Sequence, residues 1–439
     1  MVVIGRRQLY KTEPLRSWPR AKELRLGYYK RYATIKESGG VRWAGGAWAF
    51  HSVPRGLGDD VVALAGEPYA AAVAATTELS NECLEATEAR GWARDLCAYM
   101  RNYFGSMYLD KYVFGGPFPK PDFCFQTHIC CTHTKWYQHV SEYEGIPYFG
   151  IDAGLGPFND MTPTRVDYLV AQLQDAIEWM EKVTGRQYDD EKLFHAVNNE
   201  CRVSSLWAEI CALNKAIPAP LDEKTMFGLY VLSSLDNHDD DLVSYYQELR
   251  DEVRYRVENQ IAALATERCR LISDSQPPWS ALKLWRHFEK FGAVSVGSLY
   301  TFGLIGIWDD LPDGTWGPAV PPQDKGVVLK TREDALRTIA EWTLRKPIWQ
   351  SFQDQNVKTQ MMLRIIREWQ VDGAFLHYNR GCEGSSLGIA ENRLGLLKEG
   401  VPVMSFEANM GDAREIDLPR ILARADAFME SLGLDKLED

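Results

Sequence analysis

The sequence predicts an α/β protein with two similar parallel-sheet domains of the Rossmann or flavodoxin type, and with helical N-terminal and middle segments. Short apolar segments alternate with helical periodicity on both sides of a long helical stretch, a pattern typical of β–α–β units. Two ten-residue segments, EGIPYFGIDA (144–153) and EGVPVMSFEA (399–408), share Glu, Gly, a β-branched residue, Pro and a later acidic–Ala pair at identical spacing. The chain has 439 residues, which is too long for one ordinary domain.

The two similar segments end longer units that match in order. Each follows a helix, the helix follows a cysteine, and the cysteine follows a strand that starts at an aspartate. These residues are Asp122 and Cys130 or Cys131 in the first unit, and Asp372 and Cys382 in the second. Gly commonly ends a helix, and Pro is tolerated at the start of a strand, so the shared Gly and Pro could also arise by chance at two unrelated helix–strand boundaries. The longer match favours two related strand–helix–strand units.

Local signals predict the other elements. A helix is expected to contain residues 91–107, and an apolar strand at 121–128 precedes a helix that begins near Thr132 and a strand at 146–152. Thr162 and Pro163 mark the start of another helix. Its apolar residues keep to one face: Val166, Leu169, Val170, Leu173, Ile177 and Met180. Helical spacing returns over 242–264, and the last helix begins near Asp417.

These signals divide the chain into four parts. We expect a partly helical, irregular lead-in, a first α/β domain, a helical middle segment and a second α/β domain that opens at SDSQPPW (273–279). The expected boundaries are 1–70, 71–160, 161–272 and 273–439.

Composition restricts the possible partners. The formal net charge is −12, whereas nucleic acids and anionic membranes bind basic surfaces. The first 15 residues lack the apolar run of a signal peptide, and no stretch approaches the ~20 apolar residues that span a bilayer. We therefore expect a cytoplasmic protein that binds neither nucleic acid nor membrane.

Nine cysteines are unusual for such a protein. The number is odd, no C-x-x-C occurs, and a reducing compartment keeps thiols free. They are therefore either small buried side chains or ligands of a soft metal centre. In parallel α/β sheets, ligands bind beyond the carboxyl ends of the strands, where Cys130 or Cys131 and Cys382 are expected. A helix N-terminus beside each cysteine would favour the thiolate.

Three segments, in this order, resemble the family of 2-hydroxyacyl-CoA dehydratases and ATP-dependent benzoyl-CoA reductases. They are LCAYMRNYFG (96–105), PDFCFQTHICCTHTKW (121–136) and VDGAFLHYNRGCEGSSLG (371–388). The third segment is the most specific, and the resemblance continues from it almost to the end of the chain. In total it covers roughly residues 40–155 and 290–435.

The resemblance implies a [4Fe–4S] cluster held by Cys97, Cys130 and Cys382, with its fourth iron open to water or substrate. Lys135 lies five residues after Cys130, as the family pattern requires, and this spacing favours Cys130 over Cys131. The same segments contain the other candidates. Proposed proton donors are His133 and Glu383, and proposed substrate-binding residues are Trp136, Asn379 and Arg380.

Within the family, the segment NRGCEGSSLGIAENR resembles reductase subunits and favours a cluster-bearing subunit of benzoyl-CoA reductase. Such an enzyme would be an anaerobic, hetero-oligomeric oxidoreductase. The alternatives are a 2-hydroxyacyl-CoA dehydratase subunit and a non-catalytic electron-transfer or scaffold subunit. The chain has no G-x-x-x-x-G-K-[ST] loop, so ATP would be hydrolysed by a partner. The implied partners are a homologous cluster-bearing subunit, ATP-hydrolysing iron–sulfur activator subunits, ferredoxin as electron donor and an acyl-CoA substrate.

Overall fold

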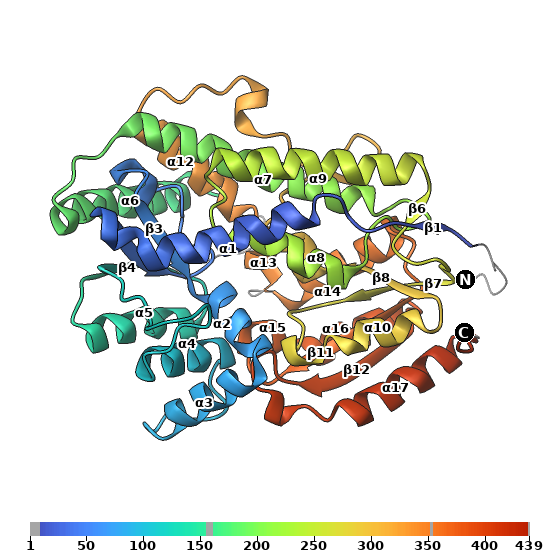
Figure 1. Cartoon of the computed structure of the whole chain (residues 1–439). Coiled ribbons are helices and arrows are strands. Elements are labelled where there is room, and N and C mark those ends of the chain that lie inside the picture. Colours follow the sequence, from blue (N-terminus) through green and yellow to red (C-terminus); the bar gives the residue numbers. More distant parts are fainter. Residues whose placement is uncertain (1–8, 155–160, 352–353, 438–439) are drawn as a thin grey trace.

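The computed structural model describes residues 9–154, 161–351 and 354–437. It contains two four-stranded parallel sheets, the first on the left of Figure 1 and the second on the right. Their strand orders are β3-β2-β4-β5 and β8-β7-β11-β12, so both sheets have the same topology. The strands are β2 (Val41–Gly45), β3 (Val61–Ala65), β4 (Phe123–His128), β5 (Tyr148–Asp152), β7 (Cys269–Ser273), β8 (Ala293–Ser298), β11 (Gly373–Asn379) and β12 (Val403–Ala408). The predicted α/β fold with two similar parallel-sheet domains is confirmed.

The internal repeat extends to individual hydrogen bonds. In the first sheet, the Asp122 carboxylate accepts a bond from the backbone N–H of Arg42 at 2.8 Å, and the Asp122 N–H donates to the Arg42 carbonyl at 2.8 Å. In the second sheet, Asp372 makes the same two bonds with Arg270, at 2.9 and 2.8 Å. Each aspartate therefore fixes the start of the strand that leads to a cysteine.

The repeated Gly-x-Pro has the same backbone in both halves. Gly145 and Gly400 have φ angles of +67° and +78°, a left-handed conformation that ends the preceding helix. The prolines start the edge strands, and their carbonyls accept from Cys124 and Ala374 respectively, each at 2.9 Å. The match between 144–153 and 399–408 therefore reflects equivalent β–α–β units.

Both domains begin earlier than the sequence predicted. Strands β2 and β3 lie within the expected lead-in 1–70 but belong to the first sheet, and β7 lies within the expected middle segment 161–272 but belongs to the second. All five residues of β3 and of β7 are buried. Strands buried on both faces lack the alternating pattern that identifies a half-exposed strand, which is why these were missed.

Two helix predictions also need correction. The helix expected over 91–107 begins only at Ala98, as α4 (Ala98–Tyr108), after a turn that follows α3 (Thr77–Glu88), so Cys97 lies at the start of a helix rather than inside one. The apolar spacing over 242–264 spans α9 (Asp240–Glu258) and then β6 (Ile261–Ala262), which pairs with β1 (Lys11–Thr12). The helix predicted from Thr162 is confirmed as α6 (Pro163–Thr184), with all six predicted residues buried.

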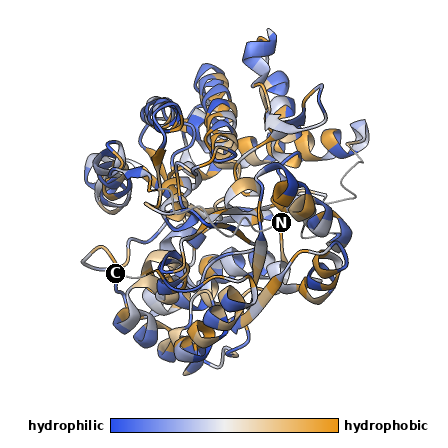
Figure 2. Cartoon of the chain, turned by 90° about the vertical axis from the view of Figure 1, so that its right-hand side faces the viewer, coloured by the Kyte–Doolittle hydropathy of each residue, from blue (hydrophilic) through white to orange (hydrophobic). Residues whose placement is uncertain are grey.

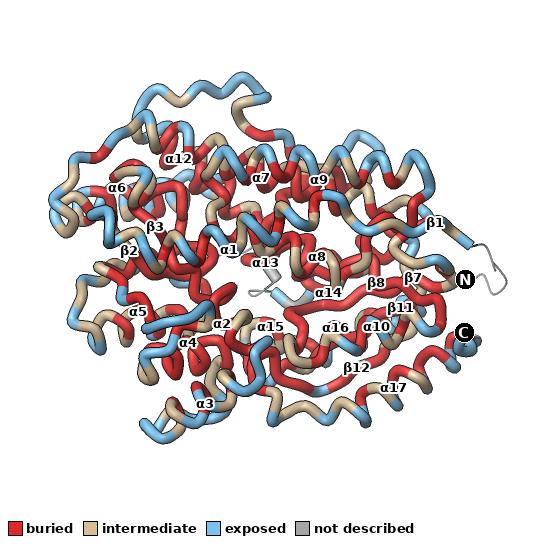
Figure 3. The backbone as a smooth tube through the Cα atoms, in the orientation of Figure 1, coloured by how far each residue is buried: buried red, intermediate tan, exposed pale blue. Residues whose placement is uncertain are grey.

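Helices cover the sheets and join them. The middle segment, with α7 (Asp190–Leu213) and α9, runs along the top of Figure 1. The strands of the second sheet and the inward faces of its helices are buried in Figure 3, and apolar residues gather in the interior in Figure 2. The remaining helices and strands are α1 (Trp18–Thr34), α2 (Gly66–Ala75), α5 (Cys131–Glu144), α8 (Glu223–Tyr230), α10 (Lys283–Glu289), α11 (Leu299–Gly303), β9 (Trp308–Asp310), β10 (Trp316–Pro318), α12 (Arg332–Leu344), α13 (Pro347–Ser351), α14 (Gln355–Glu368), α15 (Glu383–Ser386), α16 (Ile389–Lys398) and α17 (Leu418–Ser431). In the described part of the chain, no helix combines the length and apolar character that a membrane span requires.

A buried carboxyl group ties α8 to the second sheet. Glu223 accepts hydrogen bonds from Ser273 (2.6 Å), Ser295 (2.5 Å) and the Trp285 indole (2.8 Å). Burial raises the pKa of Glu223 from 4.5 to about 7, although these bonds oppose the shift. Below pH ~4.5 the group is protonated in folded and unfolded chains alike, whereas between pH ~4.5 and ~7 the unfolded chain alone releases the proton.

We therefore expect Glu223 to make the fold less stable as pH rises from 4.5 to 7. The shift corresponds to about 3 kcal/mol, at 1.36 kcal/mol per pKa unit. Glu223→Gln keeps a side chain of similar size without the titrating proton, so it should lose less stability over this range. Unfolding midpoints of both proteins at pH 4.5 to 8 would test this, and parallel pH profiles would contradict it.

Candidate functional site

Three cysteines from separate segments meet where the two domains face each other. Cys97 caps the N-terminus of α4, Cys130 caps that of α5, and Cys382 directly precedes α15. Cys130 follows β4 and Cys382 follows β11, so both lie beyond the carboxyl ends of their sheets. The charges of Cys382 and Cys130 both act on the Cys97 thiol. The structure thus brings together the three cysteines that the resemblance selected.

Two glycines allow this close approach. The N–H of Ala98 donates to the carbonyl of Gly381 at 3.3 Å, which joins the start of α4 to the loop that carries Cys382. A Cβ atom on Gly381 would lie 3.0 Å from the Ala98 Cβ and would also collide with Asn409. A Cβ on Gly411 would lie 3.0 Å from the same Ala98 atom. The two halves therefore meet through backbone where the cysteines lie.

The thiols of Cys97 and Cys130 have different surroundings. Burial raises the pKa of Cys97, and the nearby Cys382 raises it further, although the N–H groups of Met100 and Tyr99 point at its sulfur. Burial would also raise the pKa of Cys130, but the charge and hydrogen bond of His133 lower it below its ordinary value. A thiolate is the form that ligates metal. Cys130 is thus prepared as a thiolate, and Cys97 becomes one only with a compensating positive charge.

His133 connects Cys130 to a buried acid. Its Nε2 forms an ion pair with Glu67 on α2, and the other Glu67 oxygen accepts from the Ala47 N–H at 2.8 Å. Burial would lower the pKa of His133, but Cys130 and Glu67 raise it well above its ordinary value. The imidazole therefore holds a proton between a thiolate and a carboxylate. The sequence did not point to Glu67, because it follows the unpredicted strand β3.

Cys382 also has a polar neighbour. The Gln276 side-chain amide donates to its sulfur at 3.4 Å. Gln276 follows β7, and its own carbonyl contacts His377 Nδ1 at 2.8 Å, while the Asp274 carboxylate accepts from the His377 N–H at 3.0 Å. This network fixes the loop after β7 against β11. The SDSQPPW segment, which we interpreted only as a boundary, therefore contributes to the site.

The other cysteines stay apart from the three. Cys131 is exposed, whereas Cys130 is half-buried. The remaining five are buried packing residues: Cys83, Cys124, Cys201, Cys211 and Cys269.

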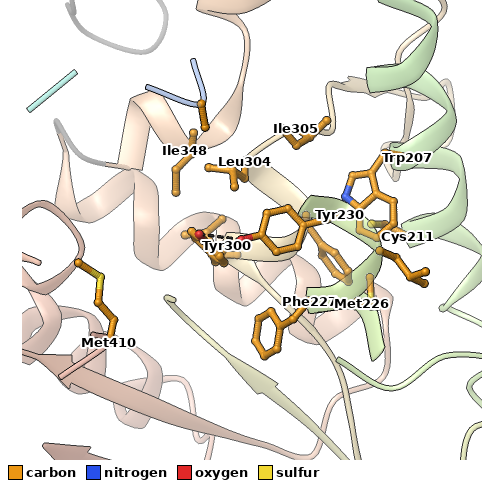
Figure 4. Packing of buried hydrophobic residues seen from close by; sticks show 14 of the residues in the cluster. Trp207, Cys211, Met226, Phe227, Tyr230, Tyr300, Leu304, Ile305, Ile348 and Met410 are labelled. Carbon is orange, nitrogen blue, oxygen red and sulfur yellow. Dashed lines mark hydrogen bonds between the residues drawn. The ribbon is translucent and has the colours of Figure 1, made fainter. Parts of the chain in front are cut away.

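A small aromatic cavity lies beside the cysteines. Tyr99, two residues after Cys97, lines it together with Tyr230 and Tyr300, whose hydroxyl groups share a hydrogen bond of 2.8 Å (Figure 4). Glu67 and Trp48 also line this cavity of about 20 Å³. That volume holds about one water molecule. The cavity is therefore small, and its wall is largely aromatic.

The predicted substrate-binding residues do not reach this cavity. Trp136 lies in the core, stacked on Tyr137 at 5.3 Å, because α5 turns it away from the interface. Arg380 is exposed and pairs with Glu407 at 2.6 Å. The Asn379 carbonyl oxygen accepts from the N–H groups of Gly381 and Met410, both at 3.1 Å, so Asn379 shapes the cysteine loop. The side chain of Glu383 lies outside the described residues.

The cysteine triad fits a polynuclear cluster better than a single ion. Ligand atoms of one metal ion would all lie within 4.8 Å of each other, and among the described residues the three sulfurs do not form such a group. Thiolates from three loops, buried with directed N–H groups, are typical iron–sulfur surroundings. A group tight enough for one ion is Asp236, His238 and Asp239, but Asp239 is already paired with Arg55 at 2.8 Å and Arg31 at 3.5 Å.

Comparison with known proteins agrees with this arrangement. Residues 49–432 match the family model described as 2-hydroxyglutaryl-CoA dehydratase, D-component. The alpha subunit of (R)-phenyllactyl-CoA dehydratase from Clostridium sporogenes is 25% identical over 79% of this chain and 79% of its own length. The (R)-2-hydroxyisocaproyl-CoA dehydratase alpha subunit from Clostridioides difficile is 24% identical over 87% of this chain and 89% of its own. The lactoyl-CoA dehydratase alpha subunit from Anaerotignum propionicum is 24% identical over 83% and 85%.

These relatives favour the dehydratase alternative over our first interpretation as a benzoyl-CoA reductase subunit, and a lyase over an oxidoreductase. The family match covers all three converging cysteines and every strand of the two sheets except β2 (Val41–Gly45). The chain belongs to the 2-hydroxyglutaryl-CoA dehydratase D-component family.

Proposed function

We propose that this chain is the cluster-bearing subunit of a 2-hydroxyacyl-CoA dehydratase, which removes water from a 2-hydroxyacyl thioester to give the 2-enoyl thioester. The observation that carries the proposal is the meeting of Cys97, Cys130 and Cys382 beside a small aromatic cavity. Those cysteines would hold a [4Fe–4S] cluster with one open iron. When bound, it would supply a single electron and a Lewis-acidic iron to the thioester.

The surrounding residues suit the other half of this reaction. The C2–O and C3–H bonds break: the leaving hydroxide takes a proton and departs as water, and the C3 proton goes to the base that this donation leaves behind. Imidazolium His133 holds such a proton, and Glu67 keeps its ring oriented. The cavity wall, with Tyr99, Tyr230 and Tyr300, excludes water that would otherwise quench reactive intermediates. No net oxidation or reduction of the substrate occurs.

The proposal includes partners. The relatives are named as alpha subunits, so a second, homologous subunit is expected to complete the enzyme. Electron delivery would need an ATP-hydrolysing iron–sulfur activator, with ferredoxin as its donor. Anaerobic conditions would protect a cluster with an open iron.

The number of electrons consumed per product molecule tests the function. The anaerobically purified complex is supplied with activator, ATP, limiting reductant and either a 2-hydroxyacyl-CoA or benzoyl-CoA. We expect many turnovers of the 2-hydroxyacyl-CoA per electron, with 2-enoyl-CoA as the product. Consumption of two electrons per benzoyl-CoA would instead support the reductase. If the electron paramagnetic resonance spectrum of the cluster does not change when any acyl-CoA is added, the scaffold alternative is supported.

Gln276→Leu should make the cluster harder to reduce. The amide stabilises negative charge on the Cys382 sulfur, and hydrogen bonds to cluster sulfurs raise the reduction potential. We expect a potential on the order of 50 mV more negative, since ~1 kcal/mol corresponds to about that shift for one electron. Redox titration followed by electron paramagnetic resonance would measure it. Gln138→Leu on the surface of α5 is the control, and equal potentials in all three proteins would contradict the prediction.

A further inference from the structure

A buried lysine lies behind the loop that carries Cys382. The ammonium group of Lys358, on α14, forms an ion pair with Asp274 at 3.3 Å and donates to the Ser385 carbonyl at 2.8 Å. All three residues are buried. Lysine is almost never fully buried without partners, because removing an ammonium group from water costs much free energy. None of the three segments that carry the family resemblance contains Lys358.

The two contacts of Lys358 lead to the two partners of one hydrogen bond. Ser385 lies in α15, the single helical turn that starts directly after Cys382, and its hydroxyl donates to the Cys382 carbonyl at 3.4 Å. Asp274 lies two residues before Gln276, whose side-chain amide donates to the Cys382 sulfur at 3.4 Å. The ammonium group of Lys358 therefore joins the loop that carries the sulfur to the loop that carries its donor.

The loop that carries the donor is also fixed to the second sheet. One oxygen of Asp274 accepts from the backbone N–H of His377 at 3.0 Å, while the other faces Lys358. The Nδ1 atom of His377 contacts the Gln276 carbonyl at 2.8 Å, and its ring stacks on Phe406 with 5.0 Å between the ring centres. The donor loop is thus anchored to β11, and Lys358 connects this anchored unit to the cysteine loop.

The first domain also has a buried charge pair beside its cysteine. His133 pairs with Glu67, and both side chains are buried. His133 hydrogen-bonds to the Cys130 sulfur directly, whereas Lys358 contacts the two loops beside Cys382. The two domains therefore place a polar donor at a cysteine sulfur in different ways.

We propose that Lys358 is a positioning residue of the cysteine site, which sets the hydrogen bond from Gln276 to the Cys382 sulfur by holding the two loops together. This inference rests on the proposed function for the presence of a cluster. Hydrogen bonds to the ligand sulfurs stabilise the reduced, more negative state of an iron–sulfur cluster. Lys358 therefore raises the reduction potential through Gln276, and the bond lengthens when the lysine contacts are lost.

The reduction potential of the anaerobic complex, titrated by electron paramagnetic resonance, tests this role. Lys358→Met removes the ammonium group but keeps a long side chain. We expect its reduction equilibrium to be about fivefold less favourable, roughly the effect of one net hydrogen bond. At 59 mV per tenfold change for one electron, this is about 40 mV towards a more negative potential. In a Gln276→Leu background, Lys358→Met should add less than about twofold, because the bond that it positions is already absent. Additive effects of the two substitutions would overturn the proposal.

Two further variants separate position from charge and from packing. Lys358→Met leaves the Asp274 carboxylate buried without its cation, whereas Lys358→Met/Asp274→Asn removes both charges and keeps the oxygen that accepts from His377. This neutral pair should show the same shift, and a wild-type potential in it would overturn the proposal. Lys346→Met is the matched control, because Lys346 is also a buried lysine, paired with Glu200 on α7 at 3.7 Å. It should keep the wild-type potential, and an equal shift there would contradict a specific role for Lys358.

Alkylation of Cys382 gives a readout that needs neither a cluster nor turnover. In the complex stripped of iron by a chelator, Lys358→Met should raise the rate at which iodoacetamide modifies Cys382 about fivefold, because the cysteine loop loses one anchoring contact. Peptide mass spectrometry measures the rate, and Lys346→Met again serves as the control. An unchanged rate would overturn the positioning role. If the rate rises as expected but the wild-type complex holds no iron or dehydrates no 2-hydroxyacyl-CoA, the positioning role stands and the proposed function fails.

Discussion

Cys130→Ala should lose the cluster and essentially all activity, whereas Cys131→Asp should retain both. The two residues are adjacent, but Cys130 is the half-buried cap of α5 with a lowered pKa, and Cys131 is exposed in the first turn. Successive residues at a helix start point in different directions, so one of the two can face the domain interface. A thiol next door therefore does not substitute for Cys130.

Iron and acid-labile sulfide in the anaerobic complex measure this outcome. The decrease in Cys130→Ala, Cys97→Ser and Cys382→Ser should equal one cluster per copy of this chain, because the partner subunit keeps its own. Cys211→Ser is the control, since that thiol is buried in α7. Full iron content in Cys130→Ala together with loss in Cys131→Asp would make Cys131 the ligand. Full content in both would place the cluster elsewhere.

The sequence predicted the features of this protein that are repeated. Two copies of one β–α–β unit could be aligned because Asp122 and Asp372 begin their strands in the same way and Gly145 and Gly400 end their helices in the same way. Each copy also has a cysteine in the same place. A single strand pattern is weak evidence for a β–α–β unit, but the second copy of the pattern in the same chain supports the same prediction independently.

Features that depend on strands buried on both faces were missed. Glu67 and Gln276 follow β3 and β7, whose residues are all buried and show no alternation. Their partners, His133 and Cys382, are more than sixty residues away in sequence, so no local spacing connects them. The aromatic wall could not be predicted for a related reason: Trp48 lines the cavity from a loop after β2, and no local pattern distinguishes it from Trp136, which lies in the core on α5.

The proton chemistry depends on a contact between two such distant segments. His133 comes from α5 of the first domain, and Glu67 from the helix after β3. The pair is buried and Glu67 lines the aromatic cavity, so its proton exchanges poorly with solvent. The Glu67 carboxylate raises the proton affinity of the imidazole, as an orienting acid does in other catalytic pairs.

His133→Gln should lower the dehydration rate about 10²- to 10⁴-fold, the usual contribution of a positioned acid–base group. Glutamine can still donate a hydrogen bond to the Cys130 sulfur and contact Glu67, so iron content should stay normal, but it carries no transferable proton. His139→Gln is the matched control: it lies on the same helix, but its Nε2 contacts the Tyr108 hydroxyl at 2.6 Å. Turnover assays and iron analysis of the two variants separate the roles. Loss of iron in His133→Gln would mean that His133 holds the cluster in place, and unchanged turnover would remove it from the reaction.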